Sequence, residues 1–368
     1  MKKINRPVTK VNTPVLGLDV HEKMTAYAHL DRVGDEADCG RIASTREAVT
    51  ELVQATKGEG VVHVAFEAGG STWWLFDLLV ALLGREYVHV AHAKKVSAIS
   101  NSSEKNDDND AWWLAYLTYE GRLPECYIPT GTLRDLRMAT RQRFEAVKMH
   151  TRAVVRLRAL LRQMGRKLPT VKLETVSGWN YVISLCAELD TVLGQALRRC
   201  LRTVEFHREA VDDWESTIEE VAAEMPEVAV LRREIPGVGK QLAPVLVAEI
   251  WPIERFATPK ALGRFTGMTP KDRSSAGNHR KGNMTREGSR HLRWALTQAA
   301  MGCLRSRSGS GLAVGNWIRT KQKRMGAKAK ARVAAGRKLS ESIWRLFHYG
   351  ECFDMARPFG GIPDHANV

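Results

Sequence analysis

Four acidic residues in the first third of the chain stand where a metal site could form. Two of them end apolar runs typical of buried strands, and two stand three residues apart at the start of an expected helix: Asp19, Glu67, Asp107 and Asp110. Side chains at strand ends reach the crevice at the carboxyl edge of an α/β sheet, and residues three apart share one face of a helix. Carboxylate oxygens suit Mg²⁺ or Mn²⁺, and two such ions can activate a nucleophile and stabilise a leaving oxygen in phosphodiester cleavage. The set therefore predicts a metal-dependent centre for phosphodiester chemistry.

Each of these acidic residues also has a simpler interpretation. An Asp after a strand is commonly a turn residue or a helix cap, and acidic residues at a helix start are favoured by the helix dipole. The order of the four along the chain favours the metal site. Asp108 competes with Asp107, but Ala111 follows Asp108 by three positions, so Asp107 and Asp110 form the better pair.

A second candidate centre lies in residues 267–285, where adjacent serines, glycines and many cations share one predicted loop. Ser274 or Ser275 could attack a phosphodiester as a nucleophile. Cations of the same loop could neutralise the attacked phosphate: Arg273, Arg280 and Lys281. The alternative is a loop that binds phosphate without catalysis.

Residues 231–250 predict a helix-hairpin-helix, because a Pro-Gly-Val-Gly turn separates two apolar helical segments. Gly237 and Gly239 would let the backbone approach a phosphate, which the N–H groups at the start of the second helix could bind. Such hairpins can also serve only to pack. The candidate nucleic-acid contacts are Gly237, Gly239, Lys240, Arg273, Arg280, Lys281, Arg286 and Arg290.

The elements that must position the carboxylates follow an α/β pattern, in which short β-like runs alternate with helical stretches. We expect strands at 15–20, 24–30, 61–66 and 87–91, and helices at 45–57, 73–83 and 107–118. Residues 1–128 are therefore predicted to form one α/β domain.

Helical segments replace the β-like runs after about residue 129. Long stretches rich in Arg, Leu, Glu and Ala at 133–164 and 191–224 predict either a coiled-coil arm or a compact helical subdomain within 129–225. Either form could carry oligomerisation. Residues 226–350 are predicted to form a second, mainly helical domain, and residues 351–368 a loosely ordered tail.

The charge of the chain is concentrated near its C-terminal end. The net charge is +15 over 368 residues, yet residues 255–350 hold 22 Lys and Arg against three acids, which leaves the remainder slightly acidic. A positive field confined to one region favours a polyphosphate partner, although a solvated basic surface is the alternative. The length predicts more than one folded domain, and nucleic acid is the leading partner.

Composition excludes several classes of protein. With 44% hydrophobic and 26% charged residues the chain is neither disordered nor a membrane protein, and no apolar stretch is long enough to span a bilayer. Six scattered cysteines are expected to be reduced and mostly buried. We expect the protein to be cytoplasmic.

The order of the motifs resembles the DEDD-type transposases of bacterial insertion sequences, family one-hundred-and-ten, which are bridge-RNA-guided serine recombinases. Three runs resemble the RuvC-like (RNase H-like) N-terminal domain of that family: GLDVHE at 17–22, FEAGG at 66–70 and KNDDNDA at 105–111. Three more resemble its C-terminal transposase domain: IPGVG at 235–239, RFTGMTP at 264–270 and GNMTREGSRHLR at 282–293.

The resemblance implies a recombinase that cuts and rejoins donor and target DNA through a phosphoserine intermediate, guided by a bridge-type RNA. It makes Asp19, Glu67, Asp107 and Asp110 the metal-binding tetrad, loaded with Mg²⁺ or Mn²⁺. It also implies a homo-oligomer, a dimer or tetramer, in which different protomers supply the two halves of the site.

The family's serine precedes a glycine, whereas here Ala276 separates Ser275 from Gly277. Counting five residues beyond Pro270 selects Ser275, with Ser274 as the rival. Two other functions compete with the recombinase: a Holliday-junction-type nuclease that uses a metal-bound water, and a DNA-binding protein without enzymatic activity.

Overall fold

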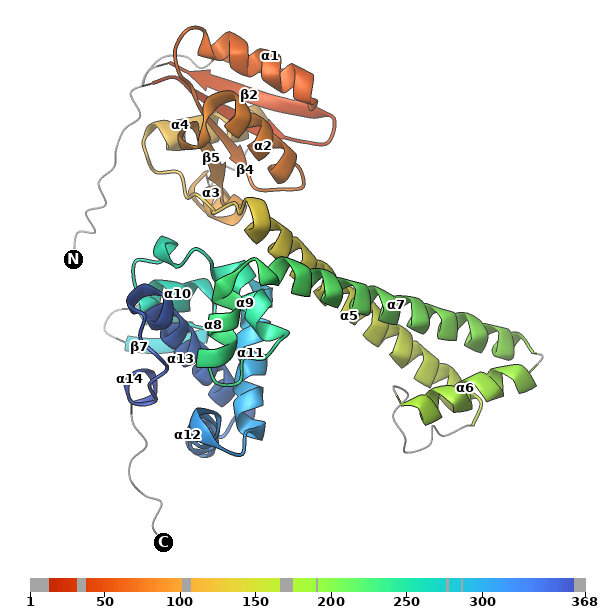
Figure 1. Ribbon diagram of the computed structural model, residues 1–368. Coiled ribbons are helices and arrows are strands. Elements are labelled where there is room, and N and C mark those ends of the chain that lie inside the picture. The colour runs from red at the N-terminus through yellow and green to blue at the C-terminus, as the bar shows by residue number, and fades with distance from the viewer. Residues whose placement is uncertain are drawn as a thin grey trace. The chain divides into compact units, whose positions relative to one another are not determined.

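The computed structural model describes residues 13–31, 38–100, 107–165, 175–189, 191–275, 278–285 and 287–360 (Figure 1). For residues 97–100, 107–108, 271–275, 278–283 and 358 it describes the backbone alone. The chain forms two compact units that divide between Pro129 and Thr130. None of the described helices is long and apolar enough to cross a membrane.

The first unit is built on a five-stranded mixed sheet with the order β3-β2-β1-β4-β5. Its strands are β1 (Val15–Val20), β2 (Met24–Leu30), β3 (Asp38–Ala43), β4 (His63–Glu67) and β5 (Val88–Ala91). Its helices are α1 (Arg46–Lys57), α2 (Thr72–Leu83), the 3-10 turn η1 (Arg85–Tyr87), α3 (Ala93–Ser100) and α4 (Asp107–Tyr119). Strands β1, β4 and β5 run parallel, while β2 and β3 are antiparallel to their neighbours.

The two faces of this sheet carry different helices because side chains alternate along each strand. One face buries Leu16, Leu18 and Phe66 against residues of α1 and α2. The opposite face packs small residues, such as Ala65, against α4. The side chains of Asp19 and Glu67, at the ends of β1 and β4, must therefore lie on one of these two faces.

The expected strands and helices of this unit are confirmed, with ends that differ by only a residue or two. Strand β3 and helix α3 were not predicted. The β3 sequence, DCGRIA, lies at the sheet edge with no buried residue, so it lacks the apolar alternation that reveals a strand.

In the residues of the second unit that the structure describes, the regular structure is helical apart from one β-hairpin. Its helices are α5 (Gly131–Gln163), α6 (Val176–Glu188), α7 (Val192–Ala223), α8 (Pro226–Glu234), α9 (Leu242–Ile250), the 3-10 turn η2 (Ile253–Arg255), α10 (Pro259–Phe265), α11 (Arg290–Arg305), α12 (Gly309–Met325), α13 (Lys328–Tyr349) and α14 (Ala356–Phe359). The hairpin consists of β6 (Pro270–Ser275) and β7 (Asn278–Met284).

Helices α5 and α7 form a long arm, with α6 at its far end (Figure 1). Leu157 and Leu161 of α5 and Leu197 of α7 share a core with α6, and Arg143 pairs with Glu215 nearer the base at 2.5 Å. The two helices therefore run antiparallel. The two long helices expected in this region are confirmed.

Two expectations for the second unit are wrong. The serine region is not a loop but two paired strands, because its mixed polar sequence hides their alternation. Residues 351–360 are not loose, because the Trp317 indole donates a hydrogen bond to the Phe359 carbonyl at 3.0 Å and the Phe359 side chain is buried. The rest of the expected tail, residues 361–368, lies outside the described residues.

The six cysteines are all free, as expected. Cys186, Cys200 and Cys303 are buried, whereas Cys39 and Cys352 are exposed. Burial raises the pKa of the Cys303 thiol to about 12, so this thiol stays protonated and behaves as an apolar side chain.

Candidate functional site

Asp19 and Glu67 lie at the same edge and on the same face of the sheet. Strands β1 and β4 pair in parallel with Leu18 opposite Phe66, so Asp19 and Glu67 are the next residues of neighbouring strands. Leu18 and Phe66 point into the core under α1 and α2. By alternation, both carboxylates belong to the opposite face, where α4 packs.

Helix α4 rests directly on strand β1 at Gly17. A Cβ atom at position 17 would lie 2.7 Å from the Ala115 backbone nitrogen and even closer to the Ala111 carbonyl oxygen. Only glycine permits this approach. The contact fixes the height of α4 above the strand that ends in Asp19.

The direction of α4 places its first turn beside Asp19. Ala111 packs against Ala26, which is the partner of Asp19 across β1 and β2. Ala115, one turn later, packs against Val15 at the other end of β1. Helix α4 therefore runs antiparallel to β1.

Asp110 lies in the first turn of α4, at the end of the helix where Asp19 stands, and its side chain is half-buried. Asp107 is the first residue of α4, and its backbone places it one turn from Asp110. The structure thus brings Asp19, Glu67 and Asp110 to one end of the sheet and places the backbone of Asp107 there.

His21 contacts the candidate centre and was not singled out from the sequence. Its Nε2 lies 3.0 Å from Oδ2 of Asp19, whose side chain is only 14% exposed. A histidine bonded to a carboxylate ligand restricts how that carboxylate can turn. The sequence could have predicted this contact, because an Asp-x-His spacing at the end of an extended strand puts both side chains on one face.

Among the described side chains, no group of three or more His, Cys, Asp or Glu residues is close enough to hold a metal ion. The Asp107 side chain lies outside that search. The chemistry of the donors fits a hard divalent cation, since all four candidates offer carboxylate oxygens. Their role as ligands stays a prediction.

The candidate serines lie at the tip of the β6–β7 hairpin. Ser275 ends β6 and pairs with Asn278, the first residue of β7, while Ser274 pairs with His279. Neighbouring positions of a strand lie on opposite faces of the ribbon. Positions 274 and 275 therefore belong to different faces.

The strand register distributes the cations between these two faces. Arg273 pairs with Arg280, and both share a face with position 275. Lys281 pairs with Asp272, and both share a face with position 274.

The base of the hairpin is fixed to α10 and α11. The Thr285 N–H donates to the Thr269 carbonyl at 2.9 Å. Gly288 adopts a left-handed φ of 109°, and any Cβ there would overlap the Phe265 carbonyl oxygen. Ser289 then caps α11 by accepting a hydrogen bond from the Leu292 N–H at 3.2 Å. These contacts fix the base of the hairpin to α10 and α11.

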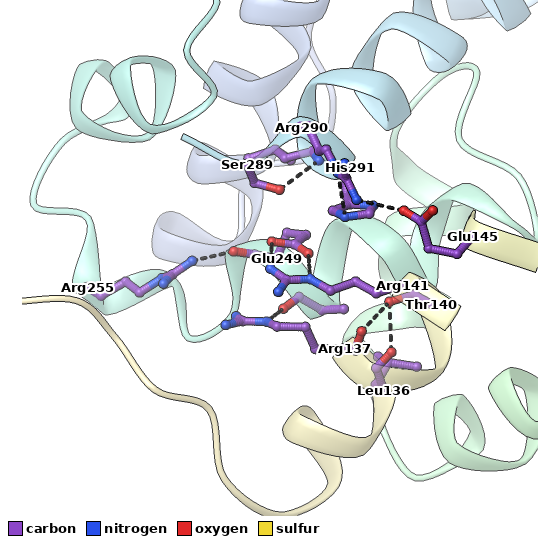
Figure 2. A network of polar contacts seen from close by, with 12 residues as sticks. Leu136, Arg137, Thr140, Arg141, Glu145, Glu249, Arg255, Ser289, Arg290 and His291 are labelled. Carbon is purple, nitrogen blue, oxygen red and sulfur yellow. Dashed lines mark hydrogen bonds and ion pairs between the residues drawn. The ribbon is translucent and has the colours of Figure 1, made fainter. Parts of the chain in front are cut away.

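A buried polar network links this base to the arm (Figure 2). Arg141 of α5 donates to both carboxylate oxygens of Glu249 in α9, at 2.9 and 3.1 Å. Glu249 is only 2% exposed. Arg137 donates to the Ala248 carbonyl at 2.6 Å, which adds a second tie between α5 and α9.

Helix α11 joins the same network at its first turn. Arg290 donates to Glu145 of α5 at 2.6 Å and to Nε2 of His291 at 3.3 Å (Figure 2). These residues, with Arg141, Gln142 and Ser289, line a surface pocket of about 350 Å³. The segment that follows the serine hairpin is therefore bonded to the base of the arm.

Two ionisable groups in this network have shifted pKa values. Burial alone would raise the pKa of Glu249, but the hydrogen bonds and charge of Arg141, with the charge of Arg137, outweigh it and hold the pKa below its ordinary value. Burial lowers the pKa of His291, and the charges of Arg141 and Arg290 add to this effect. Glu249 is thus ionised and His291 neutral near neutral pH.

The residues between α8 and α9 that were predicted to contact nucleic acid differ in their exposure and contacts. Gly237 has a φ of 78° and packs against α11, where a Cβ would overlap the Ala299 carbonyl oxygen. Gly239 is exposed with open space around its Cα, and Lys240 is exposed but pairs with Glu219. Arg286 lies outside the described residues. Their contacts with a phosphate stay predictions.

The comparisons with known proteins match both units. Residues 16–165 match a family model described as "Transposase", of the DEDD type, and residues 230–312 match one described as "Transposase IS116/IS110/IS902 family". The chain is 23% identical to a transposase for insertion sequence element IS1111A of Coxiella burnetii, over 92% of this chain and 91% of that protein. It is 22% identical to a "Probable family 20 transposase" of Pseudomonas aeruginosa, over 96% of this chain and 98% of that protein.

Proposed function

Since the chain belongs to the IS110 family of DEDD insertion-sequence transposases, we propose that it cuts and rejoins DNA with a serine and a metal-bound carboxylate set acting together. The observation that carries the proposal is the convergence of Asp19, Glu67 and the first turn of α4 at one end of the sheet. Three acidic positions far apart in sequence lie there on one face of the five-stranded sheet.

The carboxylates would hold Mg²⁺ or Mn²⁺ through Asp19, Glu67, Asp107 and Asp110. When bound, the metal supplies Lewis-acid stabilisation for charge that develops on phosphate oxygens. His21 would keep the Asp19 carboxylate in its orientation through their 3.0 Å contact. Gly17 would set the distance between the strand carboxylates and those of α4.

Ser275 is the better nucleophile of the two serines. Its position shares a face with Arg273 and Arg280, whereas position 274 shares a face with the acidic Asp272. The serine oxygen forms a bond to phosphorus as a backbone P–O bond breaks, and the proton that the serine loses is balanced by the one that turns the leaving DNA oxygen into a hydroxyl. Attack by the hydroxyl of another strand on the phosphoserine then restores the serine, so no other reactant is consumed.

The remaining assignments complete this proposal. The α8–α9 pair would act as a helix-hairpin-helix that contacts DNA at Gly239 and Lys240. The arm would act as a coiled coil that joins protomers into a dimer or tetramer, so that the serine of one protomer meets the carboxylates of another. A bridge-type RNA would select donor and target DNA by base pairing, and the enzyme would work in the bacterial cytoplasm at the nucleoid.

The deciding experiment traps the covalent intermediate. The full-length protein is incubated with nicked suicide DNA, Mg²⁺ and its co-purified RNA, and denaturant-resistant protein–DNA adducts are counted. We expect an adduct with the native protein and with Ser274→Ala, and none with Ser275→Ala. Asp19→Ala should bind DNA but form no adduct.

Other outcomes separate the competing functions. Cleavage that survives Ser274→Ala and Ser275→Ala together, without any adduct, would identify a nuclease that uses a metal-bound water. DNA binding without cleavage, unchanged by Asp19→Ala and by removal of Mg²⁺, would identify a non-enzymatic DNA-binding protein. Either result overturns the phosphoserine mechanism.

A further inference from the structure

Several cations lie close to the connection between α12 and α13, and none of them belongs to the candidate site. Because an α-helix rises roughly 1.5 Å per residue, the cations on each side of the connection span only about 6 Å. Gly326, with a left-handed φ of 63°, and Ala327 join the two helices. The group, called the α12–α13 cation cluster, consists of Lys321, Lys323, Arg324, Lys328, Lys330 and Arg332.

The cluster has no acidic neighbours along the sequence. No Asp or Glu occurs between Glu287 and Glu341 in the sequence. Within the part of the chain that the structure describes, none of the six cations is paired with a carboxylate, whereas Arg337 and Lys338 further along α13 both reach Glu341. A surface kept only for solubility normally mixes both signs of charge.

Helix stability explains only part of the cluster. Lys323 and Arg324 lie in the last turn of α12, where cations are favoured by the helix dipole. Lys328 and Lys330 lie in the first turn of α13, where the same dipole disfavours them. That turn contains no acidic residue, and its cap, Ala327, accepts no side-chain hydrogen bond. The cations there weaken α13, so another requirement must place them.

The cluster is exposed and in part held in position. Lys323, Arg324, Lys328 and Lys330 are all exposed to solvent. The Lys321 ammonium lies 5.3 Å from the centre of the Trp317 ring, and Trp317 is itself bonded to Phe359 of α14. A partner can therefore reach the charges without displacing other parts of the unit.

We infer that the α12–α13 cation cluster binds the phosphate backbone of duplex DNA without reading its sequence. The inference rests on the proposed function in one respect: a transposase must hold DNA beyond the bonds that it cuts. Unpaired cations on two adjoining helix ends match a polyphosphate, because each neutralised phosphate releases condensed counterions. Contacts with phosphates position the duplex but do not distinguish bases.

The test removes four exposed charges of the cluster from the full-length protein, by Lys323→Gln, Arg324→Gln, Lys328→Gln and Lys330→Gln together. Affinity for two duplexes of unrelated sequence is measured over a series of salt concentrations. We expect both affinities to fall at least tenfold at moderate salt. The slope of log affinity against log salt should shrink by about 2 to 4, since each phosphate contact contributes about 0.9. The melting temperature should change little, because the two charges removed from α13 oppose its dipole while the two removed from α12 are favoured by the dipole of that helix.

A matched control removes four exposed arginines from the arm: Arg152, Arg162, Arg199 and Arg202. It should change the salt slope by less than one. An unchanged slope in the cluster variant, an equal loss in the control, or a loss confined to single-stranded RNA overturns the inference. The variant should still form the covalent adduct at saturating DNA. If the native protein forms none, the proposed function fails, while the affinity comparison still decides the role of the cluster.

Discussion

Gly17 of β1 lies so close beneath Ala111 of α4 that a single added methyl group would overlap the Ala111 carbonyl oxygen. We therefore expect Gly17→Ala to push α4 away from the sheet and to carry Asp110 away from Asp19. Overpacking of this kind costs about 1–3 kcal/mol, more where backbone must move. Adduct formation should fall much further than this loss of stability explains.

Chemical denaturation and adduct assays check this expectation. Gly60→Ala in the same unit is the control, because a Cβ there meets its nearest atom at an ordinary 3.6 Å. A Gly17→Ala protein with native stability and native adduct yield would show that the approach of α4 does not position the carboxylates.

His21 should tune the metal site without being a ligand. His21→Ala removes the 3.0 Å contact that orients Asp19. Loss of such supporting contacts typically weakens metal binding about 10- to 100-fold. We expect the Mg²⁺ concentration for half-maximal adduct formation to rise by a similar factor, with a yield at saturating Mg²⁺ close to native.

A Mg²⁺ titration after treatment with EDTA provides the measurement, and Lys23→Gln at a nearby exposed position serves as the control. A lower yield that no amount of Mg²⁺ restores would mean that His21 acts in some other way than by orienting Asp19.

Replacing only one residue of the Arg141–Glu249 pair should lower the stability of the protein strongly. Glu249 is almost fully buried, so Arg141→Met leaves a buried charge without its main partner. Such losses typically cost about 3–5 kcal/mol, whereas exchanging both partners for apolar residues is often neutral. Arg141→Met with Glu249→Met should therefore be more stable than either single variant.

Urea denaturation of the four proteins gives the coupling energy. If the double variant is as unstable as the sum of both single variants, the two side chains do not act as a pair. Adduct assays on the double variant show whether the tie between α5 and α9 also affects the chemistry.

Stability should fall at acid pH through His291. Its folded pKa is lowered from 6.5, so below pH 6.5 the unfolded chain binds a proton that the folded chain does not, and stability decreases as pH falls. Glu249, whose folded pKa lies below 4.5, acts in the same direction near and below pH 4.5. His291→Gln should flatten the decrease that begins as pH falls through 6.5.

Denaturant midpoints at a series of pH values measure this effect. A His291→Gln profile that follows the native one would assign the acid sensitivity of this range to other groups.

The strands that carry Asp19 and Glu67 could be predicted because they are apolar runs with clear ends. The meeting of these residues with α4 depends on Gly17, whose close approach to Ala111 no local pattern encodes. The sequence predicted an apolar second helix of the helix-hairpin-helix within residues 231–250. It could not reveal that Glu249 is neutralised by Arg141, because 108 positions separate the two.

The β6–β7 hairpin could not be predicted from the sequence for a different reason. Asp272, Arg273 and Ser274 read as polar loop residues, since the usual apolar alternation of a strand is missing. Only the pairing with β7 reveals which cations share a face with each serine. His21, in contrast, lay within reach of sequence reasoning, because its partner stands two residues away.

No acidic residue occurs between Glu287 and Glu341, and this also affects the stability of the protein when no DNA is bound. Helices α11, α12 and α13 pack together while their charges repel one another, so the compact state carries an electrostatic penalty that dissolved ions relieve. Moderate salt should then raise the melting temperature of the second unit. DNA would do so more strongly, because a ligand that binds only the folded form shifts the folding equilibrium. Bound DNA would thus supply the negative charge that the three helices themselves lack.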